Sequence, residues 1–105
     1  MEDCIFCKIV KKEIPSDIIT ETEDLLVFKD LHPAFPVHYL IATKKHYKDV
    51  FEIEDGVLDV VRRLALKIQK DEDLDGFRLA INAGSYPRVA HFHAHFHSKI
   101  PTEEQ

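Results

Sequence analysis

The sequence predicts an α+β domain built on an antiparallel β-sheet of about five strands, with one long helix and a short N-terminal helix. Two observations lead to this expectation. Several strand-like segments follow one another along the chain, and a single amphipathic stretch has the spacing of a long helix. The 105 residues suffice for one modest hydrophobic core, so residues 1–105 are expected to form a single domain.

Apolar residues at helical spacing predict the two helices. The first covers 4–10 and ends before Pro15, which cannot continue a helix. In the second, Asp55 is expected to cap the N-terminus and the segment 71–76 to form the exit. The side chains that this long helix turns toward the core are predicted to be Val57, Val61, Leu64, Ala65 and Ile68.

Five segments are predicted to be strands because they carry apolar and β-branched runs between turn residues. They cover 18–21, 25–28, 39–43, 77–82 and 89 to about 97. Pro33 and Pro36 place a loop before the third strand, since proline cannot donate to a sheet ladder. Gly84 and Pro87 mark a turn before the last strand.

Charge and hydropathy exclude several functions. The net charge of −5 provides no basic field to hold a nucleic-acid backbone, so a phosphate ligand must be held by a few local donors. No apolar run approaches the roughly 18–20 residues that span a membrane. Glu2 and Asp3 stand where a secretory signal would be basic, so a cytoplasmic protein is expected.

Cys4 and Cys7 are the only cysteines, and they form a C-x-x-C pair. Two thiols three residues apart cannot staple a fold, and a cytosolic chain would keep them reduced. Metal binding, redox chemistry and no function at all remain open for this pair.

Four of the seven histidines alternate along one predicted strand, in the segment HFHAHFH (91–97). Because side chains alternate across a strand, the four imidazoles share one face, and Phe92, Ala94 and Phe96 share the other, which can pack on the core. Imidazoles this close cannot all be protonated, so several stay neutral near pH 7. Neutral imidazole is both a nucleophile and a metal ligand, so this strand is the candidate site.

This segment resembles the histidine-triad (HIT) signature, in which three histidines alternate with apolar residues. The resemblance extends over nearly the whole chain and implies a HIT-like fold. It includes CIFCKI (4–9), FKDLHP (28–33), PVHYL (36–40), KKH (44–46), and FRL (77–79) leading to NAG (82–84). Two registers are open, with the triad at His91, His93 and His95 or two residues later. Val89, which matches a valine that precedes the triad in relatives, favours the first register.

In that register the resemblance implies roles for several side chains. His93 would attack the α-phosphate of a purine nucleotide and form a transient nucleotidyl-histidine. His95 would hydrogen-bond the phosphate oxygens, as would Asn82, expected on the neighbouring strand. His38 matches a supporting position close to the triad. His97 departs from the pattern and receives no role.

The resemblance also implies a nucleoside pocket. Phe28, Asp30 and Leu31 match it, with the carboxylate accepting the ribose hydroxyls and the apolar side chains enclosing the base. The alternative for Phe28 and Leu31 is a place in the core. Relatives carry Gln-Ser or Gln-Thr before the valine, whereas Arg88 stands there in this chain. Arg88 either clamps phosphate by its charge or points to solvent.

Some members of the family and its relatives hold a structural zinc ion through a cysteine pair and two histidines. The matching residues here are Cys4, Cys7, His46 and His91. Four protein ligands complete the coordination of zinc, so such an ion would support the site and not perform chemistry. The resemblance also implies a homodimer.

Three functions are consistent with this sequence. The first is a nucleotide phosphoramidase or nucleotidyl hydrolase that acts through a covalent histidine intermediate. The second is a dinucleoside-polyphosphate hydrolase or nucleotidyltransferase, which would share the covalent step. The third is a nucleotide- or zinc-binding module with little catalysis, which the departure at Arg88 makes credible.

Overall fold

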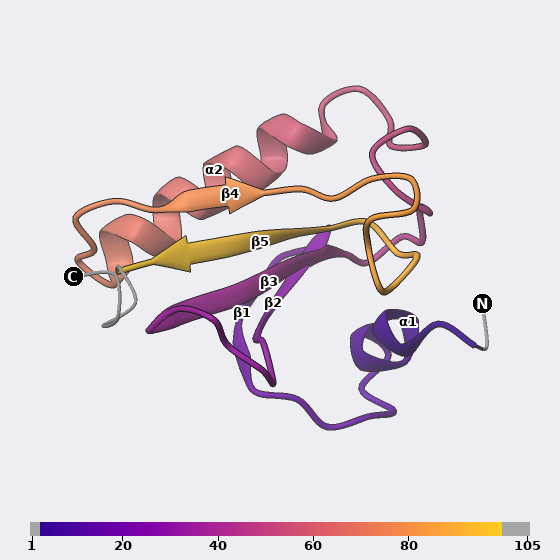
Figure 1. The fold of residues 1–105 in the computed structure, drawn as a ribbon, viewed down its shortest axis with the longest axis horizontal. Helices are drawn as coiled ribbons and strands as arrows, with labels where there is room; N and C mark the ends of the chain where they lie inside the picture. Colours follow the sequence, from indigo (N-terminus) through magenta and orange to yellow (C-terminus); the bar gives the residue numbers. More distant parts are fainter. Residues whose placement is uncertain (1–2, 100–105) are drawn as a thin grey trace.

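Five strands form one antiparallel sheet in the order β1-β2-β3-β5-β4 (Figure 1). This structure is a computed structural model, and it describes residues 3–99. The strands are β1 (Ile18–Glu21), β2 (Leu25–Lys29), β3 (Val37–Thr43), β4 (Arg78–Ala80) and β5 (His93–Ser98). The predicted α+β class, with its five-stranded antiparallel sheet, is confirmed.

Two helices lie on opposite sides of the sheet (Figure 1). The long helix α2 (Val57–Asp71) buries Val61, Leu64, Ala65 and Ile68 against one face. The short helix α1 (Ile5–Val10) packs on the other face, with Phe6 and Ile9 against side chains of β2 and β3. No helix within residues 3–99 is long and apolar enough to cross a membrane.

The N-cap of α2 is Gly56, so the prediction of Asp55 was wrong. Gly56 has φ +94°, a left-handed conformation that a residue without a Cβ adopts at little cost. The chain therefore enters the helix through a backbone turn, and no side chain caps the first turn.

Strand β5 separates an apolar face from a histidine face. Ala94 and Phe96, with Phe92 just before the strand, are each at most 2% exposed and belong to the core cluster that includes the residues of α2. The alternate residues His93, His95 and His97 lie opposite Ala42, Leu40 and His38 of β3. The predicted division of the strand into two faces is confirmed, and the histidine face is on the side of α1.

Two strands are shorter than predicted. The segment 77–82 forms a strand only over Arg78–Ala80, so Asn82 lies beyond β4 and not on it. The predicted strand 89–97 begins only at His93. The reason is local hydrogen bonding: the His91 N–H donates to the Val89 carbonyl at 2.9 Å, and the Phe92 N–H donates to the Tyr47 carbonyl at 2.7 Å. These bonds remove residues 89–92 from the ladder.

Candidate functional site

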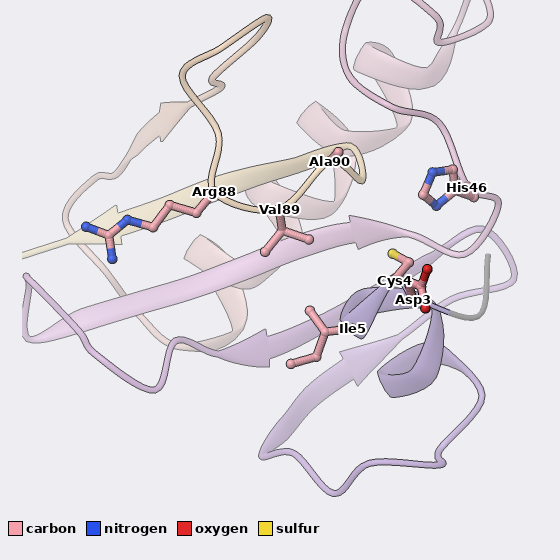
Figure 2. Close-up of a pocket in the computed structure, with 7 residues that line it drawn as sticks. All are labelled: Asp3, Cys4, Ile5, His46, Arg88, Val89 and Ala90. Carbon is pink, nitrogen blue, oxygen red and sulfur yellow. The ribbon is translucent and has the colours of Figure 1, made fainter.

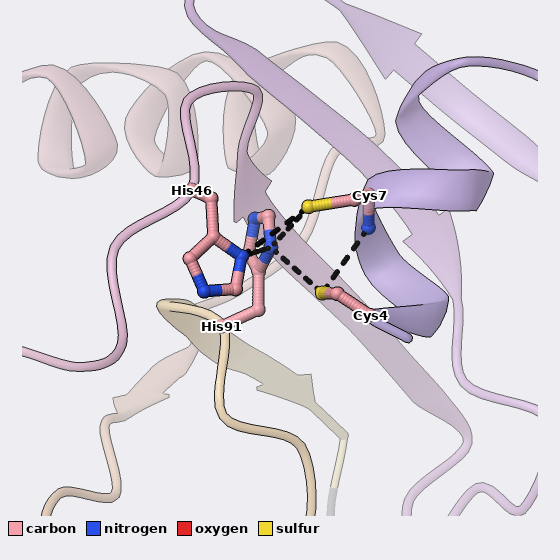
Figure 3. Close-up of side chains that lie close together, drawn as sticks. All are labelled: Cys4, Cys7, His46 and His91. Atoms are coloured by element: carbon pink, nitrogen blue, oxygen red, sulfur yellow. Dashed lines mark hydrogen bonds between the residues drawn. The ribbon is translucent and has the colours of Figure 1, made fainter. Parts of the chain in front are cut away.

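A cluster of two cysteines and two histidines lies where α1, the loop after β3 and the segment before β5 meet (Figure 3). The ligand atoms of Cys4, Cys7, His46 and His91 all lie within 4.8 Å of one another. His91 Nδ1 is 3.2 Å from Cys4 Sγ, 3.5 Å from Cys7 Sγ and 3.1 Å from His46 Nδ1. Ligand atoms around one tetrahedral zinc ion are about 3.3 Å apart for two nitrogens and about 3.8 Å apart for two sulfurs, so this donor set fits such an ion.

The orientation of His91 also fits a metal ligand. Its Nε2 lies 2.6 Å from the Thr43 carbonyl oxygen, which only accepts, so this nitrogen carries the hydrogen. The lone pair is then on Nδ1, which faces the two cysteines. A ligating histidine typically donates its other N–H to a carbonyl in this way. Burial raises the pKa of the Cys7 thiol, so a nearby cation is required to hold it as thiolate.

His93 is the first residue of β5, and a backbone carbonyl fixes one of its ring nitrogens. Its Nδ1 lies 2.7 Å from the carbonyl oxygen of His91, so Nδ1 donates and Nε2 carries the lone pair. Its ring packs edge-on against Phe6 with centroids 4.9 Å apart. His93 is only 8% exposed, and burial lowers its pKa, which keeps the imidazole neutral. A neutral imidazole with a fixed lone pair is a competent nucleophile.

His38, His95 and His97 form a second group further along the same face. His38 Nε2 lies 3.0 Å from His95 Nδ1, 3.2 Å from His97 Nε2 and 3.2 Å from Asp30 Oδ2. The Ala34 N–H donates to His38 Nδ1 at 3.0 Å, so the hydrogen of neutral His38 is on Nε2. If His38 donates this hydrogen to His95 Nδ1, His95 in turn has a donor on its Nε2.

The other predicted site residues differ in their surroundings. Phe28 is 3% exposed and packs on Phe6 in the core, whereas Leu31 is 83% exposed. Asp30 Oδ1 accepts from the His32 backbone N–H at 2.8 Å, which leaves Oδ2 toward His38. Asn82 is exposed, and no polar contact joins it to the histidine face within the described chain.

Arg88 lines a cavity of about 490 Å³ beside the Cys/His cluster, together with Asp3, Cys4, Ile5, His46, Val89 and Ala90. Its side chain points away from the rest of the lining (Figure 2). Arg88 is exposed, the arrangement of the second of the two alternatives, in which it points to solvent. The cavity borders Cys4 and His46 of the Cys/His cluster, and His93 and His95 are not part of its lining.

Asp49 lies near the site, and the sequence pattern did not predict a role for it. It is 4% exposed, and its Oδ2 accepts the N–H of Gly84 at 3.1 Å while its Oδ1 accepts that of Phe51 at 2.9 Å. Asp49 thus ties the loop after His46 to the turn that follows Asn82. This contact joins residues 35 positions apart, and nothing in the local sequence distinguishes Asp49 from other acidic residues.

The comparisons with known proteins agree with this geometry. A family model described as "Scavenger mRNA decapping enzyme C-term binding" matches residues 3–104. The chain is 37% identical over 101 residues to protein HitA of Neisseria gonorrhoeae, covering 92% of this chain and 94% of that protein. It is 39% identical over 101 residues to a 14 kDa zinc-binding protein of Brassica juncea, covering 90% and 89%.

Solved structures give the same result. A histidine triad protein from Clostridium difficile has a TM-score of 0.86 and 40% identity, covering 97% of this chain and 96% of that chain. A HIT family hydrolase from Clostridium thermocellum has a TM-score of 0.86 and 36% identity, covering 97% and 95%. The chain therefore belongs to the histidine-triad (HIT) family.

The histidine face should make the stability of the fold sensitive to acid. Burial lowers the pKa of His95 and of His97 from 6.5 to about 4. At pH values between about 4 and 6.5, these imidazoles are protonated in the unfolded chain and neutral in the folded chain. The free energy of unfolding is therefore highest above pH 6.5 and falls as the pH approaches 4. His97→Phe removes one such group. The fall in Tm between pH 7 and pH 5, measured by thermal melting, should therefore be smaller for this variant than for wild type.

The control for this experiment is His32→Phe, which removes an exposed imidazole and should retain the full loss between pH 7 and pH 5. Equal losses in wild type and His97→Phe would contradict the prediction.

Proposed function

We propose that this chain is a nucleotide phosphoramidase or nucleotidyl hydrolase that acts at the α-phosphate through a covalent nucleotidyl-histidine on His93. The observation that carries the proposal is the 2.7 Å contact between His93 Nδ1 and the His91 carbonyl oxygen. This contact leaves the Nε2 lone pair available for attack. It favours the register His91, His93 and His95, because a triad beginning at His93 would make His95 the nucleophile, whose Nδ1 faces an imidazole and no carbonyl.

The reaction would proceed by two displacements. His93 Nε2 attacks phosphorus, the bond from phosphorus to the leaving nitrogen breaks, and the departing amine takes a proton from solvent water. Water then attacks the phosphorus of the nucleotidyl-histidine, the N–P bond breaks, and the nucleoside monophosphate and a free imidazole result. His95 would stabilise the phosphate oxygens with its Nε2–H, since preorganised donors lower the barrier most where charge develops.

The substrate would be a purine nucleotide. Asp30 would accept ribose hydroxyls through Oδ2, Leu31 would cover the base with its exposed side chain, and Phe28 would support that wall from the core. Asn82 would reach the phosphate from the turn beyond β4 once a ligand orders its contacts. Arg88 points away from the site in this structure, so we do not assign it to the phosphate.

Zinc would be held by Cys4, Cys7, His46 and His91, and its role would be structural. When bound, the ion would balance the thiolate charge and connect α1 to the segment that carries His93. The sequence similarity to a zinc-binding protein of Brassica juncea supports this assignment. We further propose a homodimer formed through β4, the edge strand next to β5, and a cytoplasmic location.

The proposal is tested with adenosine 5′-phosphoramidate. The zinc-loaded protein should release ammonia and AMP in equal amounts, and rapid quenching in an alkaline denaturant, in which the P–N bond survives, should retain an AMP adduct on one histidine. Diadenosine polyphosphates are the comparison substrates, and faster cleavage of these would favour the second function. Absence of turnover on every substrate, with AMP still bound, would leave a binding module and contradict the proposal.

A further inference from the structure

His97 is held in one orientation at the end of the histidine face. Phe35 stacks on its ring with centroids 4.1 Å apart and an interplanar angle of 22°. The guanidinium of Arg78 lies over the Phe35 ring at 5.0 Å, and one of its nitrogens is 3.3 Å from His97 Nδ1. The stack and the hydrogen bond together fix the orientation of the His97 ring.

The contacts of His97 also determine which nitrogen carries its hydrogen. A guanidinium has only donors, so His97 Nδ1 accepts from Arg78 and the hydrogen of the neutral ring is on Nε2. His38 has the same tautomer, because its Nδ1 accepts from the Ala34 N–H. Burial lowers the pKa of both rings, to about 4 for His97, so both are neutral at pH 7.

Two N–H groups therefore converge, since His38 Nε2 and His97 Nε2 are 3.2 Å apart. His38 can donate to His95 Nδ1 at 3.0 Å or to Asp30 Oδ2 at 3.2 Å. For His97 Nε2, the only polar contact among residues 3–99 is with His38 Nε2, and two donors cannot satisfy each other. The histidine face thus presents a donor for which the described residues supply no acceptor, so the acceptor comes from water or from a ligand that displaces it.

The same tautomers argue against a metal ion here, although the three imidazoles lie as close together as metal ligands do. To coordinate through Nε2, His38 and His97 would each need a hydrogen on Nδ1, facing the donors of Ala34 and Arg78. His91 differs, because its Nε2–H donates to the Thr43 carbonyl oxygen and leaves the lone pair on Nδ1 available for a metal ion. The group is therefore built to donate hydrogen bonds.

We propose that His97 is a specificity-determining residue that donates its Nε2–H to a ribose hydroxyl, whose own proton is directed to Asp30. This inference rests on the proposed function, which assigns Asp30 to the ribose. A hydroxyl both accepts and donates, so it satisfies the imidazole N–H and the carboxylate together. In a deoxyribose, a hydrogen atom on carbon replaces this hydroxyl and can neither accept nor donate a hydrogen bond. The His97 N–H and the Asp30 carboxylate would then both remain unpaired in a partly buried site.

The experiment measures binding of AMP, 2′-deoxy-AMP and 3′-deoxy-AMP by calorimetry. Wild type should bind AMP more tightly than at least one deoxy analogue. In His97→Phe, which keeps the stack on Phe35, AMP should bind about tenfold more weakly, while that analogue binds as before. His97→Gln places an amide N–H near the position of Nε2–H and should restore the discrimination. Arg62→Ala, on the exposed side of α2 and away from the histidine face, is the control and should behave as wild type.

Equal weakening of all three ligands by His97→Phe would mean that His97 only supports the fold, and unchanged AMP binding would mean that it makes no contact. Either result overturns this inference and leaves the proposed function intact. Wild type that binds none of the three ligands would overturn the proposed function first. Nitrogen-15 NMR of the ligand-free protein provides an independent test, since His97 protonated on Nδ1 in place of Nε2 would contradict the tautomer assignment.

Discussion

Replacing His93 with alanine should lower turnover of adenosine 5′-phosphoramidate by at least about 10³-fold while AMP still binds within a few-fold of wild type. The reason is that the variant loses the only Nε2 lone pair that a backbone carbonyl fixes on the histidine face. In the proposed complex the phosphate and ribose contacts come from other side chains, so we expect ground-state binding to be largely retained. Steady-state kinetics and calorimetry on the same preparation separate these two effects.

Two further variants make this result specific. His93→Gly should regain part of its activity when imidazole is added, because the added base can occupy the vacated space and attack phosphorus. His32→Ala, an exposed histidine outside the face, should keep wild-type turnover. If His95→Ala were inactive while His93→Ala stayed active, the triad would begin at His93 and the assignment of roles would be wrong.

The features that were predictable from the sequence are those that periodicity encodes. Alternation along 91–97 predicts two faces whatever the partner strands are, and Phe92 and Phe96 are indeed in the core. Helical spacing predicts the buried stripe of α2, because every third or fourth residue returns to the same side. These predictions need only local geometry.

Features that depend on distant contacts were not predictable. The strand β5 begins at His93 because Phe92 donates to the carbonyl of Tyr47, a residue 45 positions away. Asp49 holds the turn at Gly84 through a similarly distant hydrogen bond. His97 had no role in the sequence pattern, since its surroundings depend on Phe35 and Arg78 meeting across the sheet.

The histidine tautomers show this limit most clearly. The sequence contains four alternating imidazoles that are chemically identical. The structure gives His91 a carbonyl at Nε2, and it gives His93 a carbonyl at Nδ1. The first imidazole therefore directs a lone pair from Nδ1 toward the cysteines, and the second directs one from Nε2 away from the backbone. Their different chemistry follows from which backbone oxygen each ring meets.

Removing zinc should destabilise the fold by about 4 kcal/mol, the contribution of a ligand present at 1,000 times its Kd. For a domain of this size, that corresponds to a fall in Tm of roughly 15 °C or more. The physical reason is that the ion would join α1, the loop after β3 and the segment before β5 through four ligands, in addition to the apolar and backbone contacts between them. Elemental analysis of protein purified without a histidine tag measures the zinc content. Thermal melting with and without a chelator then measures the change in Tm.

Cys7→Ser supplies the control, because its Tm should already be low and should not fall further with chelator. His32→Ala should respond to chelator as wild type does. Metal-free wild type with an unchanged Tm would contradict a structural zinc ion.

Loss of zinc should also reduce activity more than it reduces AMP binding. His91 would coordinate the ion through Nδ1, and its backbone carbonyl holds His93 Nδ1 at 2.7 Å. Because His91 would contact the ion through its side chain and His93 through its backbone, movement of the metal site would displace the proposed nucleophile His93. The proposed AMP contacts at Asp30 and Leu31 lie on a different segment from His91, so we expect them to depend less on the ion. A chelated protein that lost binding and turnover in equal proportion would instead have lost its fold, and the melting curves would show it.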